Sequence, residues 1–192
     1  AQTCQKIADF VDFLWDYNRR LNLVGTKDIE QIIEKHVLDA FTVAKTFQKQ
    51  AEAKSYVDLG SGGGLPGMLV ALVNPALEVT LVDAIGKKCR FLEEATDKLC
   101  RGYRAPVRIV CARAEELFRQ PDCREHFDLG TARAVGSLKL TMELVAPALK
   151  SGVQKCFGTL SSHFFTYKTG RQTKYIGIVV QPCQRCQLGQ PG

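Results

Sequence analysis

The sequence predicts an α/β fold: a parallel sheet sandwiched between helices and preceded by an N-terminal helical extension. Short apolar runs alternate with segments of helical periodicity between residues 55 and 150, an order typical of parallel sheets. The first run opens into a glycine-rich loop, and two amphipathic segments come before it. We therefore expect one domain over 1–192, made of N-terminal helices (1–50), a ligand-binding core (51–150) and a basic C-terminal part (151–192).

The N-terminal extension is expected to contain two helices, at 5–18 and 29–47. In both segments apolar residues recur every three or four positions, as they do on the buried face of a helix. For the second helix, this spacing predicts a core face that consists of Ile32, Ile33, Val37, Ala40, Phe41, Ala44 and Phe47.

The core follows as four strand–helix units. We expect strands at 55–60, 78–84, 107–113 and 126–134, and helices at 65–74, 86–100, 114–118 and 138–150. Pro66 suits a first helical turn, where its missing N–H costs nothing. Pro75 and Pro147 should end the helices before them. In the C-terminal part, strands are expected at 153–160 and 174–180, whereas 161–173 shows no clear period.

Charge is distributed unevenly along the chain. It has 26 Lys and Arg against 20 Asp and Glu, a net charge of +6. Residues 150–192 contain six basic residues and no acid, so they carry the whole excess. A phosphate-rich partner would suit this asymmetry, and a merely solvated tail is the alternative. No stretch approaches the ~18 apolar residues of a membrane span.

The eight cysteines are scattered, and we expect reduced thiols packed as small hydrophobic side chains. Cys183 and Cys186 have the spacing of zinc ligands, but no second pair accompanies them. Because a closed zinc site needs four ligands, no metal site is expected.

The loop "DLGSGGGLPG" (58–67) places five glycines within eight residues at the end of the first strand. In open parallel sheets, ligands bind beyond the carboxyl ends of the strands, where glycines allow close approach. The run from Gly62 to Gly67 matches GxGxxG, so a nicotinamide dehydrogenase is one alternative, although this motif alone is weak evidence. Asp58 and the GxGxG spacing instead resemble motif I of class I S-adenosylmethionine (SAM) methyltransferases, in which an acid can neutralise the cofactor's ammonium group directly or through a water molecule.

Two further positions complete the expected cofactor site. Asp83 ends the second strand, where a carboxylate can accept both ribose hydroxyls; a helix-capping role is the alternative. Ala114 and Glu115 follow the third strand, in the loop that flanks the adenine in this fold.

The motifs together resemble one family, the 16S ribosomal RNA guanine-N7 methyltransferases of the GidB/RsmG type. The resemblance covers roughly residues 15–150 and rests on "NLVGTKDIEQIIEKHVLDAF", "VDLGSGGGLPG", "TLVDAIGKKCRFLEE", "ARAEEL" and "FDLGTARAVGSL". It implies a class I SAM-dependent methyltransferase (Rossmann-like) fold, SAM as cofactor, and a guanine of small-subunit rRNA as substrate. Beyond this range the chain departs from the family: the Lys-Gly pair expected after the next strand is Phe157-Gly158 here.

The resemblance also implies roles for single residues. Gly60 and Leu65 would contact SAM from the loop, and Arg133 would lie near the methionine part and the incoming base as the candidate catalytic residue. His36 and Asp39 match the family's "H..D" element in front of the pocket; an ordinary half-buried helix histidine is the alternative for His36.

Guanine N7 carries a lone pair and no proton, so alignment without a general base would suffice for methyl transfer. RNA contacts are expected from the N-terminal loop, the "GKKCR" segment and the basic tail, the first two contributing Arg19, Arg20, Lys27, Lys87, Lys88 and Arg90. We further expect a monomer that acts on ribosomal RNA or the small ribosomal subunit, away from membranes, in the cytoplasm or, if the source is eukaryotic, in an organellar stroma or matrix. The alternatives are a methyltransferase for another substrate and a non-catalytic SAM- or RNA-binding relative.

Overall fold

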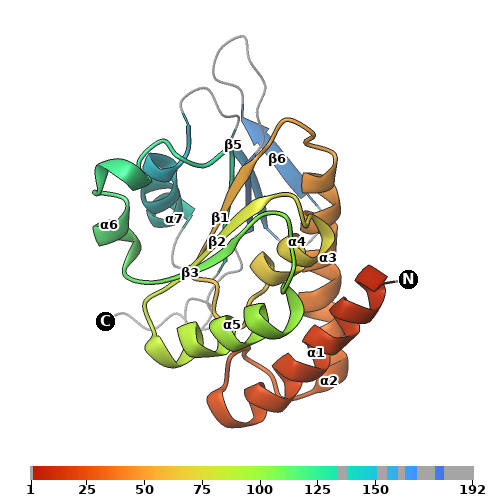
Figure 1. Cartoon of the computed structure of the whole chain (residues 1–192). Helices are drawn as coiled ribbons and strands as arrows, with labels where there is room; N and C mark the ends of the chain where they lie inside the picture. Colours follow the sequence, from red (N-terminus) through yellow and green to blue (C-terminus); the bar gives the residue numbers. More distant parts are fainter. Residues whose placement is uncertain (1, 134–137, 151–154, 160–162, 168–175, 180–192) are drawn as a thin grey trace.

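The computed structural model describes residues 2–133, 138–150, 155–159, 163–167 and 176–179. Its centre is a four-stranded parallel sheet in the order β3-β2-β1-β4 (Figure 1). The strands are β1 (Ser55–Leu59), β2 (Glu78–Asp83), β3 (Val107–Cys111) and β4 (Leu129–Ala132). All four predicted strands are confirmed, each somewhat shorter than predicted.

Helices cover both faces of this sheet, as predicted (Figure 1). One face carries α1 (Gln2–Leu21), α3 (Leu38–Gln48), α4 (Gly67–Val73) and α5 (Gly86–Leu99). The opposite face carries α6 (Ala114–Leu117), α7 (Leu138–Val145) and the 3₁₀ turn η3 (Ala146–Ala148), and a further 3₁₀ turn, η2 (Pro121–Cys123), follows α6. Pro147 lies in η3, so the predicted end of the last helix is confirmed.

The alternation of side chains along the strands separates two apolar layers. Tyr56 and Leu81 pack with α1, α3, α4 and α5, whereas their neighbours Val57 and Val82 face α6 and α7. All four side chains are buried. Because both faces are covered, the central strands are apolar almost throughout, as expected of a parallel sheet.

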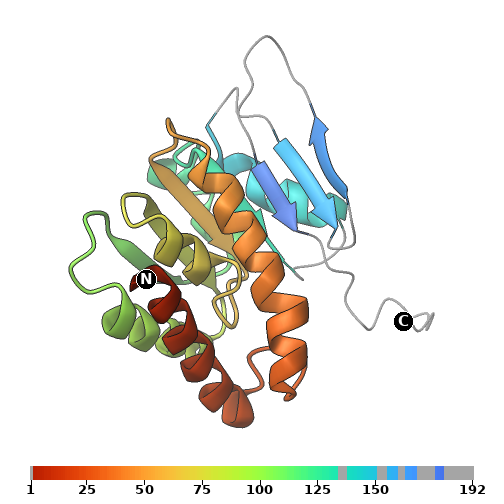
Figure 2. The same ribbon diagram turned by 90° about the vertical axis from the view of Figure 1, so that its right-hand side faces the viewer.

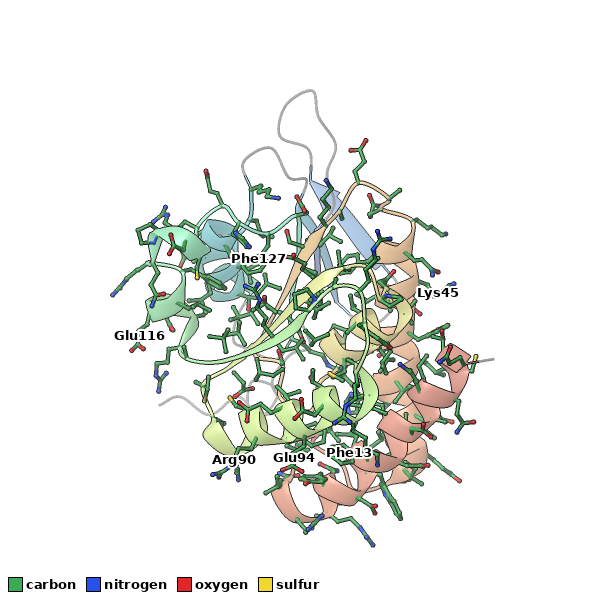
Figure 3. The ribbon with its side chains drawn as sticks, viewed as in Figure 1. Phe13, Lys45, Arg90, Glu94, Glu116 and Phe127 are labelled. Carbon is green, nitrogen blue, oxygen red and sulfur yellow. The ribbon has the colours of Figure 1, made fainter. Side chains whose placement is uncertain are left out.

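The N-terminal extension belongs to the same core as the sheet. Phe13 of α1 stacks on Phe91 of α5, with ring centroids 5.5 Å apart, and Figure 3 shows Phe13 next to Glu94 of α5. Phe10 and Leu14 of the same helix are fully buried. Burial of apolar surface therefore attaches α1 to the part of the chain that carries the glycine loop.

The second predicted helix is present but has an irregular turn. It consists of α2 (Ile29–Ile32), a π-helical turn η1 (Ile33–Val37) and α3. Ile33 and Phe41 are each 39% exposed, so their prediction as core residues is wrong. The wider π turn separates the buried Ile32 and Val37 by five positions, and Ile32 rather than Ile33 occupies the core.

The C-terminal part contributes a second sheet beside β4 (Figure 2). It contains β5 (Lys155–Thr159), β6 (His163–Tyr167) and β7 (Ile176–Val179), in the order β6-β5-β7. The strands predicted at 153–160 and 174–180 are confirmed, whereas β6 was missed. Adjacent Phe164 and Phe165 interrupt the alternation that would have indicated a strand.

Across the part of the chain that the structure describes, no helix combines the length and the apolar character needed to cross a membrane. Cys89 and Cys100 are buried free thiols, as expected, but Cys4 and Cys111 are exposed. The expectation about zinc concerns Cys183 and Cys186, which lie outside the described residues.

Candidate functional site

The glycine loop turns back sharply onto the end of β2. Gly60 and Ser61 both donate their backbone N–H groups to the carbonyl oxygen of Val82, at 2.8 and 3.0 Å. Gly60, Gly62 and Gly64 have φ values of 71°, 54° and 79°, a conformation that side chains disfavour. The Ser61 hydroxyl donates to the carbonyl oxygen of Asp58 at 2.8 Å. These bonds fix the loop where β1 and β2 end.

Packing also requires some glycines of this loop, one of which, Gly63, lines the cavity as well. A Cβ on Gly67 would come within 2.3 Å of Leu81 Cδ2 and 2.6 Å of Asp58 Oδ2. A Cβ on Gly63 would lie 3.0 Å from Val24 Cγ1, in the N-terminal extension. The sequence interpretation assigned the glycine density to a ligand, but part of it is required by helices and strands packed against the loop.

Asp58 is buried between the strands and the glycine loop and is not at the wall of the cavity. Its carboxylate is 1% exposed and is not among the groups that line the cavity described below. One oxygen accepts from Thr131 Oγ1 at 2.6 Å, and the other accepts from Gly67 N at 3.1 Å. Burial raises the pKa of Asp58 to about 7. Asp58 therefore joins β1, β4 and the start of α4, and a direct contact with a cofactor ammonium group is not supported.

Asp83, by contrast, is at the wall of the cavity. Its Oδ2 accepts from Gly62 N and its Oδ1 from Ile85 N, both at 2.9 Å. A carboxylate oxygen has two lone pairs, so each oxygen retains acceptor capacity after these bonds. Asp83 thus holds the glycine loop and the start of α5 in place while it still offers oxygen acceptors. Both the capping role and the ligand role considered for Asp83 are compatible with this geometry.

A cavity of about 420 Å³ lies beyond the carboxyl ends of the strands. Pockets for drug-sized ligands commonly measure about 300–1,000 Å³. The sequence-predicted site residues come from loops that are far apart in the chain, yet all of them line this cavity: Gly60, Leu65, Asp83, Ala114, Glu115 and Arg133. The fold therefore brings together the residues that the motifs had singled out.

Arg133 follows β4 and contacts the N-terminal extension. Its Nη2 is hydrogen-bonded to Nδ1 of His36, 97 positions away in the sequence. Burial lowers the pKa of Arg133 to about 10, so the guanidinium remains charged at neutral pH. His36 lines the cavity, in agreement with its expected place in front of the pocket. Asp39 does not line it, and burial raises the pKa of its carboxyl.

Several lining residues were not among the predicted site residues. The loop after α1 contributes Leu23, Val24 and Gly25. This loop is held by Asn18, a fully buried side chain that accepts from Val24 N at 2.9 Å and donates to Thr26 O at 2.5 Å. A polar residue on the apolar face of α1, one turn after Leu14, was the available sequence signal.

The basic residues expected to meet RNA have different surroundings. Lys88 lines the cavity, whereas Lys27, Lys87 and Arg90 are exposed. Arg19 pairs with exposed Asp16 at 3.1 Å, and Arg20 lies over the ring of Tyr17.

In the basic C-terminal part, Lys150 is used structurally. Its Nζ lies 2.8 Å from Asp128 Oδ1, and Asp128 also accepts from Ser55 N at the start of β1. Lys150 therefore lies at the edge of the sheet opposite the cavity. The other basic positions of this tail have no described side chains.

Comparisons with known proteins identify the family. The profile of GidB, described as rRNA small subunit methyltransferase G, matches residues 3–157. "Ribosomal RNA small subunit methyltransferase G" of Clostridium botulinum (strain Eklund 17B / Type B) is 34% identical over 164 residues, which are 85% of this chain and 63% of that protein. The protein of the same name from Fusobacterium nucleatum is 35% identical over 159 residues, 81% of this chain and 66% of its own length. The chain thus spans less than two thirds of these relatives.

Among solved structures, a SAM-dependent methyltransferase from Agrobacterium tumefaciens is 18% identical, with a TM-score of 0.47 over 65% of this chain and 42% of the other. The family assignment rests instead on the profile, which matches most of the chain, and it contradicts the nicotinamide dehydrogenase alternative. With its parallel sheet, its glycine loop after β1 and its profile match over residues 3–157, this chain belongs to the GidB family of rRNA small subunit methyltransferases.

Proposed function

We propose that this chain binds SAM in the cavity beyond β1, β2 and β4 and transfers its methyl group to N7 of a guanine in small-subunit ribosomal RNA. The observation that carries the proposal is the convergence of Gly60, Leu65, Asp83, Ala114, Glu115 and Arg133 on this one cavity.

The cavity wall suits an adenosine moiety. Asp83 retains acceptor capacity on both carboxylate oxygens, which matches two vicinal ribose hydroxyls. Gly62 leaves space beside that carboxylate, since a Cβ there would meet no atom closer than 3.7 Å. Ala114 and Ile85 supply apolar surface for a base, and the Glu115 position lies beside them. These residues would hold the nucleoside part of SAM.

The opposite wall suits the methionine part. The Arg133 guanidinium is a cation in a partly buried position, and carboxylates are its best-matched partners. We assign Arg133 to the carboxylate end of the cofactor, near the entering base. SAM, when bound, supplies an electrophilic methyl group.

The residues of this chain would act by alignment. Guanine N7 can act directly as the nucleophile, because it carries a lone pair and no proton. No side chain therefore has to remove a proton from it. Orientation of two reactants can lower a barrier by about 7–11 kcal/mol. Asp83, Leu65 and Arg133 would fix one reactant, and the loop around Val24 together with His36 would border the entrance for the other.

As the partner of this chain we infer small-subunit rRNA. The exposed cations Lys27, Lys87 and Arg90 would contact this RNA when it enters the cavity. The same cations would provide affinity through phosphate contacts. We further infer a monomer that acts in the cytoplasm.

Two measurements test the proposal. Calorimetry with SAM and with NAD should give binding of SAM alone, and Arg133→Ala should weaken it while the circular dichroism spectrum stays unchanged. Labelled SAM should then methylate 30S subunits or free 16S rRNA, and mapping should place the label on a guanine N7. Binding without transfer would support the non-catalytic relative, methylation of other RNA alone would change the substrate, and absence of SAM binding would overturn the proposal.

A further inference from the structure

An irregular helical turn brings one histidine to the edge of the cavity. The π-helical turn Ile33–Val37 interrupts the helix that runs from Ile29 to Gln48. Turns of this kind are rare and occur frequently at functional sites. Here Ile32 and Val37, at either end of the turn, are both buried. The wide turn therefore accommodates one additional residue without removing either neighbour from the core, and His36 lines the cavity.

The contact between His36 and Arg133 determines where the imidazole carries its proton. A guanidinium donates hydrogen bonds and accepts none. Since Arg133 Nη2 meets His36 Nδ1, this ring nitrogen must be the acceptor. A hydrogen bond in this direction requires the imidazole proton to be on Nε2.

The side chain of an arginine at a cavity wall can adopt several rotamers. A ligand that needs one of these rotamers therefore binds at an entropic cost, because the others are excluded. A partner that holds the guanidinium before the ligand arrives removes part of this cost. His36 is suited to that task because Val37 at the end of the π turn and Ala40 of α3, which are 7% and 1% exposed, anchor this part of the helix to the core.

We propose that His36 is a positioning residue: its Nδ1 holds the Arg133 guanidinium in the orientation that receives the carboxylate of the cofactor's amino-acid end. The proposal rests on the proposed SAM site and adds a specific division of labour to it. Arg133 would contact the ligand, and the π turn places the His36 imidazole where it orients Arg133.

Two ligands distinguish positioning from a general structural role. S-adenosylhomocysteine carries the amino-acid carboxylate, whereas 5′-methylthioadenosine has the same nucleoside without it. In His36→Leu, calorimetry should show S-adenosylhomocysteine bound about three- to tenfold more weakly, because Arg133 loses one contact that orders its side chain, while methylthioadenosine binding stays within about twofold.

Two further variants control this comparison. His36→Asn places an amide oxygen close to the position of Nδ1, and we expect it to restore most of the affinity for S-adenosylhomocysteine. His126→Leu is the matched control, because His126 is exposed and lies just before β4, at the edge of the sheet opposite the cavity; its affinities should equal those of the unaltered chain. Equal weakening of both ligands in His36→Leu, or no weakening, would overturn the proposal.

A spectroscopic measurement is independent of the ligand. In the ¹⁵N spectrum of the free protein, His36 should show the Nε2–H tautomer, and Arg133→Ala should relax this preference. A proton on Nδ1 would overturn the proposal even if the cofactor binds. If the unaltered chain binds neither nucleoside, the proposed SAM site fails, whereas the tautomer still reports on the contact itself.

Discussion

Two aspartates at the ends of neighbouring strands have different roles because their positions in the fold differ. Asp58 is on the face of β1 that α4 covers, where Gly67 and Thr131 use its oxygens. Asp83 ends β2 at the cavity, with acceptor capacity left after two backbone bonds. The first residue holds the scaffold together, and the second is available to a ligand.

Substitution of Asp83 should affect both the ligand and the loop. In Asp83→Asn, the amide group would face the N–H of either Gly62 or Ile85, and the charge offered to the ribose hydroxyls would be lost. Hydrogen bonds to charged groups contribute about 1.5–3 kcal/mol, so SAM affinity should fall roughly 10- to 100-fold. Calorimetry measures this change. Unaltered affinity would remove Asp83 from the cofactor site.

Asp58 should make the stability of the fold depend on pH. Burial raises its pKa to about 7 in the folded chain, whereas an unfolded aspartate titrates near about 3.9. The folded chain therefore keeps a proton that the unfolded chain has lost, and the contribution of Asp58 to stability, full below pH about 4, is lost as pH rises to about 7. With roughly 1.4 kcal/mol per pKa unit, the loss amounts to as much as about 4 kcal/mol.

Urea unfolding at several pH values between about 2.5 and 7.5 would measure this effect. Asp58→Asn should flatten the curve, because the amide can accept from Gly67 and donate to Thr131 without titrating. Asp128 provides the opposite control. Burial alone would raise its pKa, but hydrogen bonds from Lys150, Lys54 and Ser55 outweigh burial and lower it. Its stabilisation is thus present above pH about 4 and lost in acid. A curve for Asp58→Asn parallel to that of the unaltered chain would contradict the role assigned to Asp58.

At the scale of elements, the glycine loop is positioned as much by packing as by its conformation. The N-terminal extension covers it from one side through Val24 and Leu14, and Leu81 of β2 limits it from the other. Helix α1 is therefore part of the site's construction, although it contributes no side chain to the cavity wall.

A pair of glycine substitutions tests this interpretation. Gly67→Ala should destabilise the fold by about 2–3 kcal/mol, since the new methyl group would overlap Leu81 and displace Asp58 from the Gly67 amide. Gly86→Ala, in the first turn of α5, meets no atom within 4 Å and should be neutral or stabilise by up to about 1 kcal/mol. Chemical denaturation compares the two. Equal stability of both variants would show that the loop tolerates displacement.

At the scale of the whole molecule, charge near the cavity should govern RNA binding. Substitution of Lys27, Lys87 and Arg90 by Gln should reduce the salt dependence of rRNA affinity, by up to about 0.7 logarithmic units of slope per lost phosphate contact. A filter-binding titration at several salt concentrations measures the slope. The matched control replaces three exposed arginines that lie in β3 or just before it, toward the end of the strands away from the cavity: Arg101, Arg104 and Arg108. Equal slopes for the two triple variants would place the RNA elsewhere.

Much of this fold follows from local pattern. The alternation of apolar runs and helical segments predicted every element of the parallel core, because period and length distinguish a strand from a helix within one segment. The loop motifs predicted six residues that line one cavity, because the ends of parallel strands meet at one edge of a sheet.

Tertiary structure decided the relations between distant segments. The pairing of Asp58 with Thr131 and of His36 with Arg133 depends on strand order and helix placement, which periodicity does not encode. Likewise, Ile33 is exposed whereas Ile32 is buried, because a π turn begins at this point of the helix. Local pattern records which side of an element is apolar, and only the assembled layers determine which polar groups meet between elements.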